Sequence, residues 1–518
     1  MKILQTESLT YRHVLLLLIA LLSIWARVDH RYHFRKLNPD TEIIMATAAH
    51  IEQGRGGVLD HWNAADISQS IELEQRATMP GYTYLLLAVK PIAKDWLKAA
   101  WWIEIGAILA FFAAIVLWFR RLIGETASFE LGACLLLLGF SPAPLHYFPT
   151  TDILSVTAFI WGAYGLYRIQ DKMWLYGGLG LLGLGLAVSF RYAYLPLLGL
   201  LPLILHLRWW QRRDAVSLRG TLISIPSIVL VAFVLVGLKG FEGSMTEAVS
   251  PQWYIPHLAW LEPFLFKSFF YYGLPHELGL NAYWEYASLA LKSAAFICSG
   301  WLVMRLIRFS DSVFNSLFFL TSLLVVLLLS YFSIRVPAET WNEMQFWTFL
   351  METRYYAAPM MLVVIGIFAQ MRKGKGRRWM QAFLALAILA GASVTLFQKY
   401  RIYAQQDISG TFAMSNAAEV YRSASERKTI NSPKELLYNS EDSRIGEIFG
   451  FVSVPMEVGL DNLQTAPRSD SLLLYAFFSV EGILTPSENA WQERSDTEKL
   501  EKNAKGEWWL QKLYPNID

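Results

Sequence analysis

Eleven apolar runs of helical length recur along this chain of 518 residues, and they constrain its fold more than any other feature. A helix that crosses the hydrocarbon core of a bilayer needs about 20 mainly apolar residues. Hydrophobic residues make up 54% of the chain, and its mean hydropathy of +0.32 is too high for an ordinary soluble protein of this length. The sequence therefore predicts an all-α polytopic membrane protein with about 11 transmembrane helices, at 11–28, 100–119, 127–146, 151–168, 173–189, 192–207, 220–238, 286–304, 313–333, 355–371 and 379–397.

The charges between these runs predict the orientation of the chain. Lys and Arg concentrate in short cytoplasmic loops, and here every second loop is basic. These loops contain Arg120 and Arg121, Arg168 and Lys172, Arg208 with Arg212, Arg213 and Arg219, Arg305 and Arg308, and the run RKGKGRR at 372–378. We therefore expect a cytoplasmic N-terminus and a C-terminus outside, with the first run retained as a helix.

Three segments should then lie outside the membrane, at about 29–99, 239–285 and 398–518. In the first, Lys90, Lys94 and Asp95 interrupt an apolar stretch, so 81–95 reads as an interfacial or re-entrant helix. In the third, KELLYN, IFGFVSVP and SLLLYAFF have the composition of strands. The predicted domains are a transmembrane domain at 1–397 and a small extracytoplasmic α/β domain at 398–518.

Two acids stand where the outer segments meet the membrane. Asp40, followed by Glu42, opens the stretch LNPDTEIIMATAAHIEQGRGG, whose apolar residues recur at helical spacing until Gly54. This spacing predicts a short amphipathic helix that lies along the membrane surface. Asp152 opens the fourth predicted span after two threonines. For each acid, capping of a helix N-terminus and a role in a reaction remain alternatives.

Arg191 and Arg354 occupy corresponding places at the outer ends of apolar runs. A guanidinium there needs water or an anion beside it, and its planar fork suits a phosphate or a carboxylate. The alternatives are snorkelling or pairing with an acid, which would be Asp152 for Arg191 and Glu343 or Glu352 for Arg354.

Other outer residues give weaker signals. Glu74 and Arg76 precede the Pro80-Gly81-Tyr82 turn, while His257, His276 and Glu277 lie in an aromatic-rich segment and form only a weak candidate for metal binding. The net charge of +2 gives no overall field that would favour nucleic acid. The chain has no Walker loop, GxSxG elbow, HExxH or CxxC pattern, which disfavours ATP-driven transport and common hydrolase chemistry.

The order of these features resembles the GT-C superfamily of integral membrane glycosyltransferases, in the style of its protein-mannosyltransferase and aminoarabinose-transferase branch. The order is one span, the acid-opened segment from Asp40 to Gly56, Arg76 with Pro80 to Tyr82, a span ending in Arg120-Arg121, then Thr151-Asp152 and Arg191-Tyr192. The ordered features match the superfamily over residues 11 to about 210. The remainder of the chain is similar in its hydropathy pattern and in the Arg354-Tyr355 element. Because QRATMPGY only partly matches the signature of the aminoarabinose branch, the sugar does not carry over.

The resemblance implies a polyprenyl-phosphate-linked sugar donor and transfer to a lipid, glycan or protein acceptor on the outer face. Asp40 would be the catalytic base or orient the acceptor, and Asp152 would be a supporting or acceptor-binding acid. The donor phosphate would be bound by Arg191, Arg354 and Arg76. Acceptor binding or support falls to Glu42, Glu74, Tyr82, Tyr192 and Tyr355.

Some relatives of this superfamily bind a divalent metal near the first acid, while others need none. The candidate ligands here are Asp40, Glu42, His257 and His276. Two other functions stay open: a transporter or flippase for lipid-linked saccharides, and a non-catalytic scaffold. The compact loops and the resemblance favour the bacterial inner membrane.

Overall fold

A computed structural model of the chain describes most of the predicted membrane domain and the strands that follow it. The described residues are 39–62, 70–74, 78–124, 151–237, 297, 304, 311–335, 357–373, 435–439, 452–455, 473–479, 491–492, 499–502 and 508–515.

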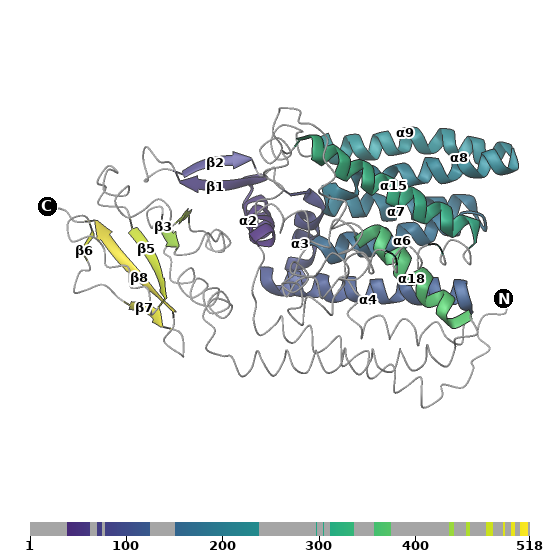
Figure 1. Ribbon diagram of the computed structural model, residues 1–518. Helices are drawn as coiled ribbons and strands as arrows, with labels where there is room; N and C mark the ends of the chain where they lie inside the picture. Colours follow the sequence, from purple (N-terminus) through teal and green to yellow (C-terminus); the bar gives the residue numbers. More distant parts are fainter. Residues whose placement is uncertain are drawn as a thin grey trace.

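Helices dominate the described part of the chain, and they pack side by side into a bundle (Figure 1). Among the described residues, five helical segments are long and apolar enough to cross a membrane: Trp96–Ile123, Met173–Phe190, Tyr192–Arg212, Ala215–Val234 and Ser312–Tyr331. The chain is therefore an integral membrane protein. The bundle contains α4 (Trp96–Ile123), α6 (Thr151–Tyr167), α7 (Met173–Phe190), η2 (Tyr192–Gly199), α8 (Leu200–Arg212), α9 (Ala215–Gly237), α15 (Ser312–Arg335) and α18 (Ala357–Lys373).

Seven of the predicted spans coincide with these helices, and the 3-10 helix η2 continues into α8 as one of them. The other four, at 11–28, 127–146, 286–304 and 379–397, lie outside the described residues apart from isolated helical positions at 297 and 304.

The closest helix packing lies between α6 and α7 and depends on glycine. A Cβ atom added to Gly183 would lie 2.4 Å from the backbone nitrogen of Gly162, a separation that real Cβ atoms do not reach. Small residues let helix backbones approach closely inside a membrane, where apolar burial alone does not drive helices together. The glycines of these two runs therefore serve packing.

One end of the bundle, which we call the basic end, is tied together by side-chain contacts. Asp171, in the turn between α6 and α7, pairs with Arg168 at 2.7 Å and with Arg121 of α4 at 3.2 Å. The hydroxyl of Tyr167 donates to Asp311, just before α15, over 2.6 Å. Basic residues from the predicted cytoplasmic loops after α4, α6 and α8 thus share one end of the bundle. The side of the membrane that this end faces stays a prediction.

The opposite end, which we call the hairpin end, contains α2 (Pro39–Glu52), the antiparallel pair β1 (Val58–Trp62) and β2 (Ser70–Glu74), and α3 (Pro80–Ala93). The ion pair Arg55–Glu72 at 2.6 Å joins the turn after α2 to β2, and a pair between Lys90 and Glu52 joins α3 to α2. The predicted interfacial helix at 81–95 is confirmed as a short helix of its own. It ends where Lys94 takes a left-handed conformation, after which Asp95 caps α4 by accepting a hydrogen bond from the Lys98 N–H at 3.0 Å.

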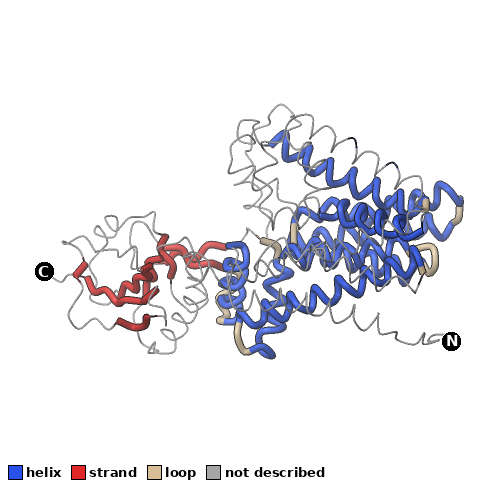
Figure 2. Tube along the Cα trace, turned by 60° about the horizontal axis from the view of Figure 1, so that its bottom comes forward, coloured by secondary structure: helices blue, strands red, loops and turns tan. Residues whose placement is uncertain are grey.

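The strands of the C-terminal part lie beyond the hairpin end (Figure 2). They form a mixed sheet in the order β4-β3-β5-β8-β6, with β7 also paired to β8. Strands are confirmed in all three stretches where the sequence predicts them. The boundary at 398 and the α/β character of the whole tail stay predictions. The strands are β3 (Glu435–Asn439), β4 (Val452–Pro455), β5 (Leu473–Ser479), β6 (Trp491–Gln492), β7 (Lys499–Lys502) and β8 (Trp508–Pro515).

Candidate functional site

The hairpin end of the bundle holds a buried ion pair between Asp152 and Arg191. Nη1 of Arg191, at the end of α7, donates to Oδ1 of Asp152, in the first turn of α6. Their side chains are 12% and 2% exposed. The contact confirms the pairing of Arg191 with Asp152 that the sequence left as an alternative. A buried arginine without an acid beside it would be strongly unfavourable. Phosphate binding by Arg191 stays a prediction.

Arg191 lies at a break between helix α7 and the 3-10 helix η2. Helix α7 ends at Phe190, Arg191 takes an extended conformation with φ −149, and the chain resumes as η2. Pro196 has no N–H to donate to the carbonyl of Tyr192, so one α-helical hydrogen bond is missing from this segment. A stretch of 3-10 helix between two membrane helices often marks a functional position, and here it turns the guanidinium toward α6.

Two further polar residues surround the pair. Ser155 is fully buried, and its hydroxyl donates to the backbone carbonyl of Asp152 at 2.9 Å. Tyr194 of η2 is also buried, next to Ser155, and its hydroxyl is near enough to interact electrostatically with both members of the pair. Tyr192, the tyrosine predicted from the sequence, is half-buried, and Tyr194 was not predicted. The run RYAYLP does not distinguish the two tyrosines, because packing decides which one turns inward.

The Pro80-Gly81-Tyr82 element lies against the same end of α7. Pro80 is the first residue of α3, where its missing N–H costs nothing. A Cβ atom on Gly81 would lie 2.5 Å from both the carbonyl oxygen and the hydroxyl oxygen of Ser189, two residues before Arg191. Tyr82 is buried beside it. The Pro-Gly-Tyr element therefore forms the first turn of α3 and packs against the end of α7, two residues from Arg191 in the chain.

Helix α2 contributes a second buried carboxylate, that of Glu42, which is 1% exposed. The predicted helix is confirmed, ending before Gly54 at φ +77. Of the two alternatives for Asp40, the N-cap does not fit, because α2 includes Pro39 and Asp40 therefore lies inside the helix. Asp152 likewise follows the first residue of α6, so neither acid is the N-cap. An acid in the first turn still suits the positive end of the helix dipole.

Helix α2 is also more enclosed than a surface helix. Thr41, Ile44, Met45 and Ala49 are buried with Glu42, whereas Ile43 is half-buried. The imidazole Nδ1 of His50 lies 2.7 Å from the carbonyl oxygen of Val58 and ties the helix to β1. The helix thus packs between α3 and the hairpin, and it is not the amphipathic surface helix that its apolar spacing indicates.

Glu104, inside α4, is a buried acid that was not among the residues predicted from the sequence. Its side chain is 3% exposed, while Trp102 and Leu109 of the same helix face outward. Hydrogen bonds from Thr157 to the Ala107 carbonyl and from Trp161 to the Ala110 carbonyl fix the register of α4 against α6. At a rise of about 1.5 Å per residue, this register places Glu104 about 3 Å along the bundle axis from Asp152. An acid within an apolar run was the sequence signal.

The remaining predicted site residues are described only in part. The strand β2 includes Glu74, whose Cα pairs with that of Val58, but its side chain and that of Asp40 lie outside the described atoms. Arg76, Arg354, Tyr355, His257 and His276 lie outside the described residues. Among the residues that are described, no group of three or more His, Cys, Asp or Glu side chains could hold a metal ion.

The fold is similar to that of solved glycosyltransferase structures. The crystal structure of ArnT from Cupriavidus metallidurans bound to undecaprenyl phosphate matches over 98% of both chains, with a TM-score of 0.53 and 12% identity. The structure of the same enzyme in the apo state matches over 96% of this chain and 97% of the other, with a TM-score of 0.54 and 11% identity. No protein-family model and no curated protein matches the sequence. The likeness shows the fold: the chain has the GT-C fold that the order of its sequence features predicts.

Proposed function

We propose that the protein is a membrane glycosyltransferase that moves a sugar from a polyprenyl-phosphate-linked donor to an acceptor on the outer face of the membrane. The observation that carries the proposal is the buried Asp152–Arg191 pair at one end of an apolar bundle. Charged groups inside a membrane protein are costly and usually serve function. The fold supports the proposal, since ArnT, which matches over almost the whole chain, was solved with undecaprenyl phosphate bound.

In this proposal the acceptor's hydroxyl oxygen attacks the anomeric carbon of the sugar, and the bond from that carbon to the phosphate oxygen breaks. The hydroxyl proton passes to the carboxylate of Asp40, which acts as general base. Polyprenyl phosphate leaves with the bonding electrons. Its growing negative charge is stabilised by Arg191, together with Arg76 and Arg354.

Asp152 takes a narrower role than the sequence implied. Because it contacts Arg191 directly, we assign it as the positioning residue that holds the guanidinium toward the donor phosphate. A guanidinium carries five N–H donors, so it can serve a carboxylate and a phosphate together. Tyr194 and Ser155 support the pair from η2 and α6.

No step of this proposal is assigned to a divalent metal. Of the predicted ligands, only Glu42 has a described side chain, and the described residues bring no metal-binding cluster together. Glu42 is instead assigned to support of the acceptor, along with Glu74, Tyr82, Tyr192 and Tyr355.

The placement of the site follows from the orientation that the charges predict. The basic end would face the cytoplasm and the hairpin end the outside, in a bacterial inner membrane. The tail at 398–518 would then lie outside, beyond the hairpin end, where it could contact the acceptor.

The transfer assay with a substitution at Asp40 tests the proposal. Membranes containing the wild-type protein or Asp40→Asn receive a panel of radiolabelled polyprenyl-phosphate sugars, and label is counted in lipid, glycan and protein fractions. We expect transfer by the wild type and a loss of at least about 100-fold in Asp40→Asn. The matched control is Glu72→Gln, which changes an exposed acid of the hairpin and should leave transfer intact.

The alternatives give different outcomes in the same assay. Equal transfer by Asp40→Asn and wild type would remove Asp40 from the reaction. Absence of transfer with every donor would favour the scaffold or the transporter. Movement of the lipid-linked donor across proteoliposomes would then identify the transporter.

A further inference from the structure

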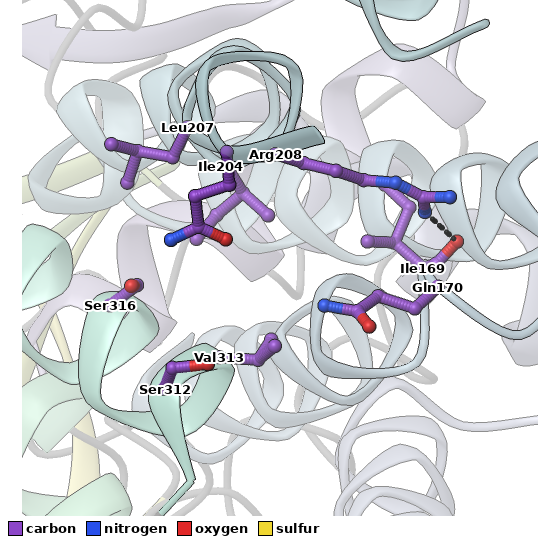
Figure 3. Close-up of a pocket in the computed structure, with 9 residues that line it drawn as sticks. Ile169, Gln170, Ile204, Leu207, Arg208, Ser312, Val313 and Ser316 are labelled. Carbon is purple, nitrogen blue, oxygen red and sulfur yellow. Dashed lines mark hydrogen bonds between the residues drawn. The ribbon is translucent and has the colours of Figure 1, made fainter. Parts of the chain in front are cut away.

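A small hollow opens at the basic end of the bundle, far from the Asp152–Arg191 pair. Its volume is about 20 Å³, and it lies between the turn after α6, the last turns of α8 and the first turns of α15 (Figure 3). A space of this size admits one water molecule or one oxygen atom of a larger group. Gln170, Gln211, Ser312 and Ser316 contribute polar side chains to its wall.

Arg208, one of the residues that line the hollow, has a donor nitrogen without a hydrogen-bond acceptor in the described part of the chain. Its Nη1 donates to the carbonyl oxygen of Ile169 at 3.0 Å, which fixes the guanidinium in the wall. Its Nε is enclosed and has no hydrogen-bond partner within the described part of the chain. A buried donor without an acceptor is costly, and more so on a charged group. Because Arg208 lines the hollow, an oxygen atom that entered it would lie beside this guanidinium.

The charges around the hollow favour an anion over water. Arg212 donates to the Gln170 side chain at 2.8 Å and keeps its positive charge at the rim. Helix α15 begins at Ser312, so the positive end of its dipole faces the same place. Asp311 precedes Ser312 and caps α15 by accepting a hydrogen bond from the Phe314 N–H at 2.9 Å, so its carboxylate offsets the helix dipole. The positive charge beside the hollow therefore comes from Arg208 and Arg212.

The other acids of this end are also engaged. Asp171 pairs with two arginines, and Asp214 accepts two hydrogen bonds from Ser217, at 2.7 and 2.8 Å. Further positive charge comes from Arg213, which lies over the rings of Trp209 and Trp210 at 5.1 and 4.6 Å. Tryptophan next to arginine is typical of the membrane–water interface.

We propose that this hollow binds the phosphate group of an anionic membrane lipid in the leaflet opposite the reaction site. One phosphate oxygen enters the hollow and accepts a hydrogen bond from the guanidinium of Arg208. The remaining oxygens lie at the mouth, near Gln211 and Ser312. Basic pockets between transmembrane helices on the cytoplasmic side bind anionic headgroups in this way. The lipid would clamp α8, α15 and the α6–α7 turn, and the site does not depend on the proposed glycosyl transfer.

The test measures lipid-dependent stabilisation of the purified full-length protein. The melting temperature is recorded with added phosphatidylglycerol, with phosphatidylcholine and with inorganic phosphate, and retained lipid is counted by native mass spectrometry. We expect phosphatidylglycerol to raise the melting temperature and phosphatidylcholine to leave it unchanged. The apparent affinity for phosphatidylglycerol should fall at least about tenfold in Arg208→Gln, because a charge-assisted hydrogen bond is lost.

Arg219→Gln is the matched control, since Arg219 is an exposed arginine of the same end that does not line the hollow. It should keep the full response to the anionic lipid. Because Arg208→Gln also loses the contact with Ile169, the readout is the shift caused by lipid and not the starting stability. A response to inorganic phosphate equal to that of the lipid would identify a free anion as the source. An equal lipid response in Arg208→Gln and Arg219→Gln would overturn the proposal.

Discussion

The Asp152–Arg191 pair allows the structural and the functional role of one arginine to be separated by a double-mutant cycle. The variants are Asp152→Asn, Arg191→Gln and the double variant. In Asp152→Asn the guanidinium stays buried without its carboxylate, and in Arg191→Gln the carboxylate stays without its cation. The double variant removes both charges and places a neutral amide side chain, Asn or Gln, at each of the two positions.

The expected size of the effect follows from burial. With side chains 2% and 12% exposed, the pair belongs to the buried class, for which removal of one partner costs about 3–5 kcal/mol. The double variant should lose less than either single variant, because no uncompensated charge remains. Arg121→Gln is the control, since the Arg121 side chain is 49% exposed and its pair with Asp171 should contribute at most about 1 kcal/mol.

Stability is measured by titrating the protein in mixed micelles with sodium dodecyl sulfate and following tryptophan fluorescence. Transfer is measured on the same preparations. If Arg191 stabilises the leaving phosphate, the double variant should regain much of its stability and still transfer at least about 100-fold more slowly than the wild type. Recovery of transfer together with stability would refute the assignment of Arg191 and leave a structural pair. A cost below about 1 kcal/mol for Asp152→Asn would refute the argument from burial.

Three further predictions follow from single positions. Gly183→Ala should destabilise the protein by about 1–3 kcal/mol because its Cβ would overlap the α6 backbone, whereas Gly178→Ala, with nothing within 4 Å, should be neutral or stabilising; melting temperatures compare the two. Hydrogen bonds from the Ser217 N–H and hydroxyl hold the pKa of Asp214 below its usual value in the folded protein. The stability that ionised Asp214 contributes is therefore fully present above the pKa of the unfolded state and is lost as the pH falls through the lower pKa of the folded state. The wild type should therefore lose stability relative to Asp214→Asn below about pH 4, and parallel melting curves down to pH 3 would contradict this. Glu104→Gln should keep the stability of the wild type and lower transfer about tenfold or more, and unchanged transfer would make Glu104 a structural residue.

The sequence by itself determined the membrane class, the positions of the described spans and the shared basic end. These features depend on local quantities, because the length of an apolar run and the charge of a loop act on the chain whatever its tertiary contacts are. The break after Phe190 and the separate helix α3 were likewise readable, from Arg191 and from Pro80-Gly81.

Only the tertiary structure decided which polar groups meet. The sequence left Arg191 with a phosphate or a carboxylate as partner, and the packing of α7 and η2 against α6 brings Asp152 to it. Packing also turned Tyr194 inward and enclosed α2 on sides that its apolar spacing left exposed. These outcomes depend on the register and rotation of helices far apart in the chain, which are set by contacts such as those of Gly183 and by no property of a single segment.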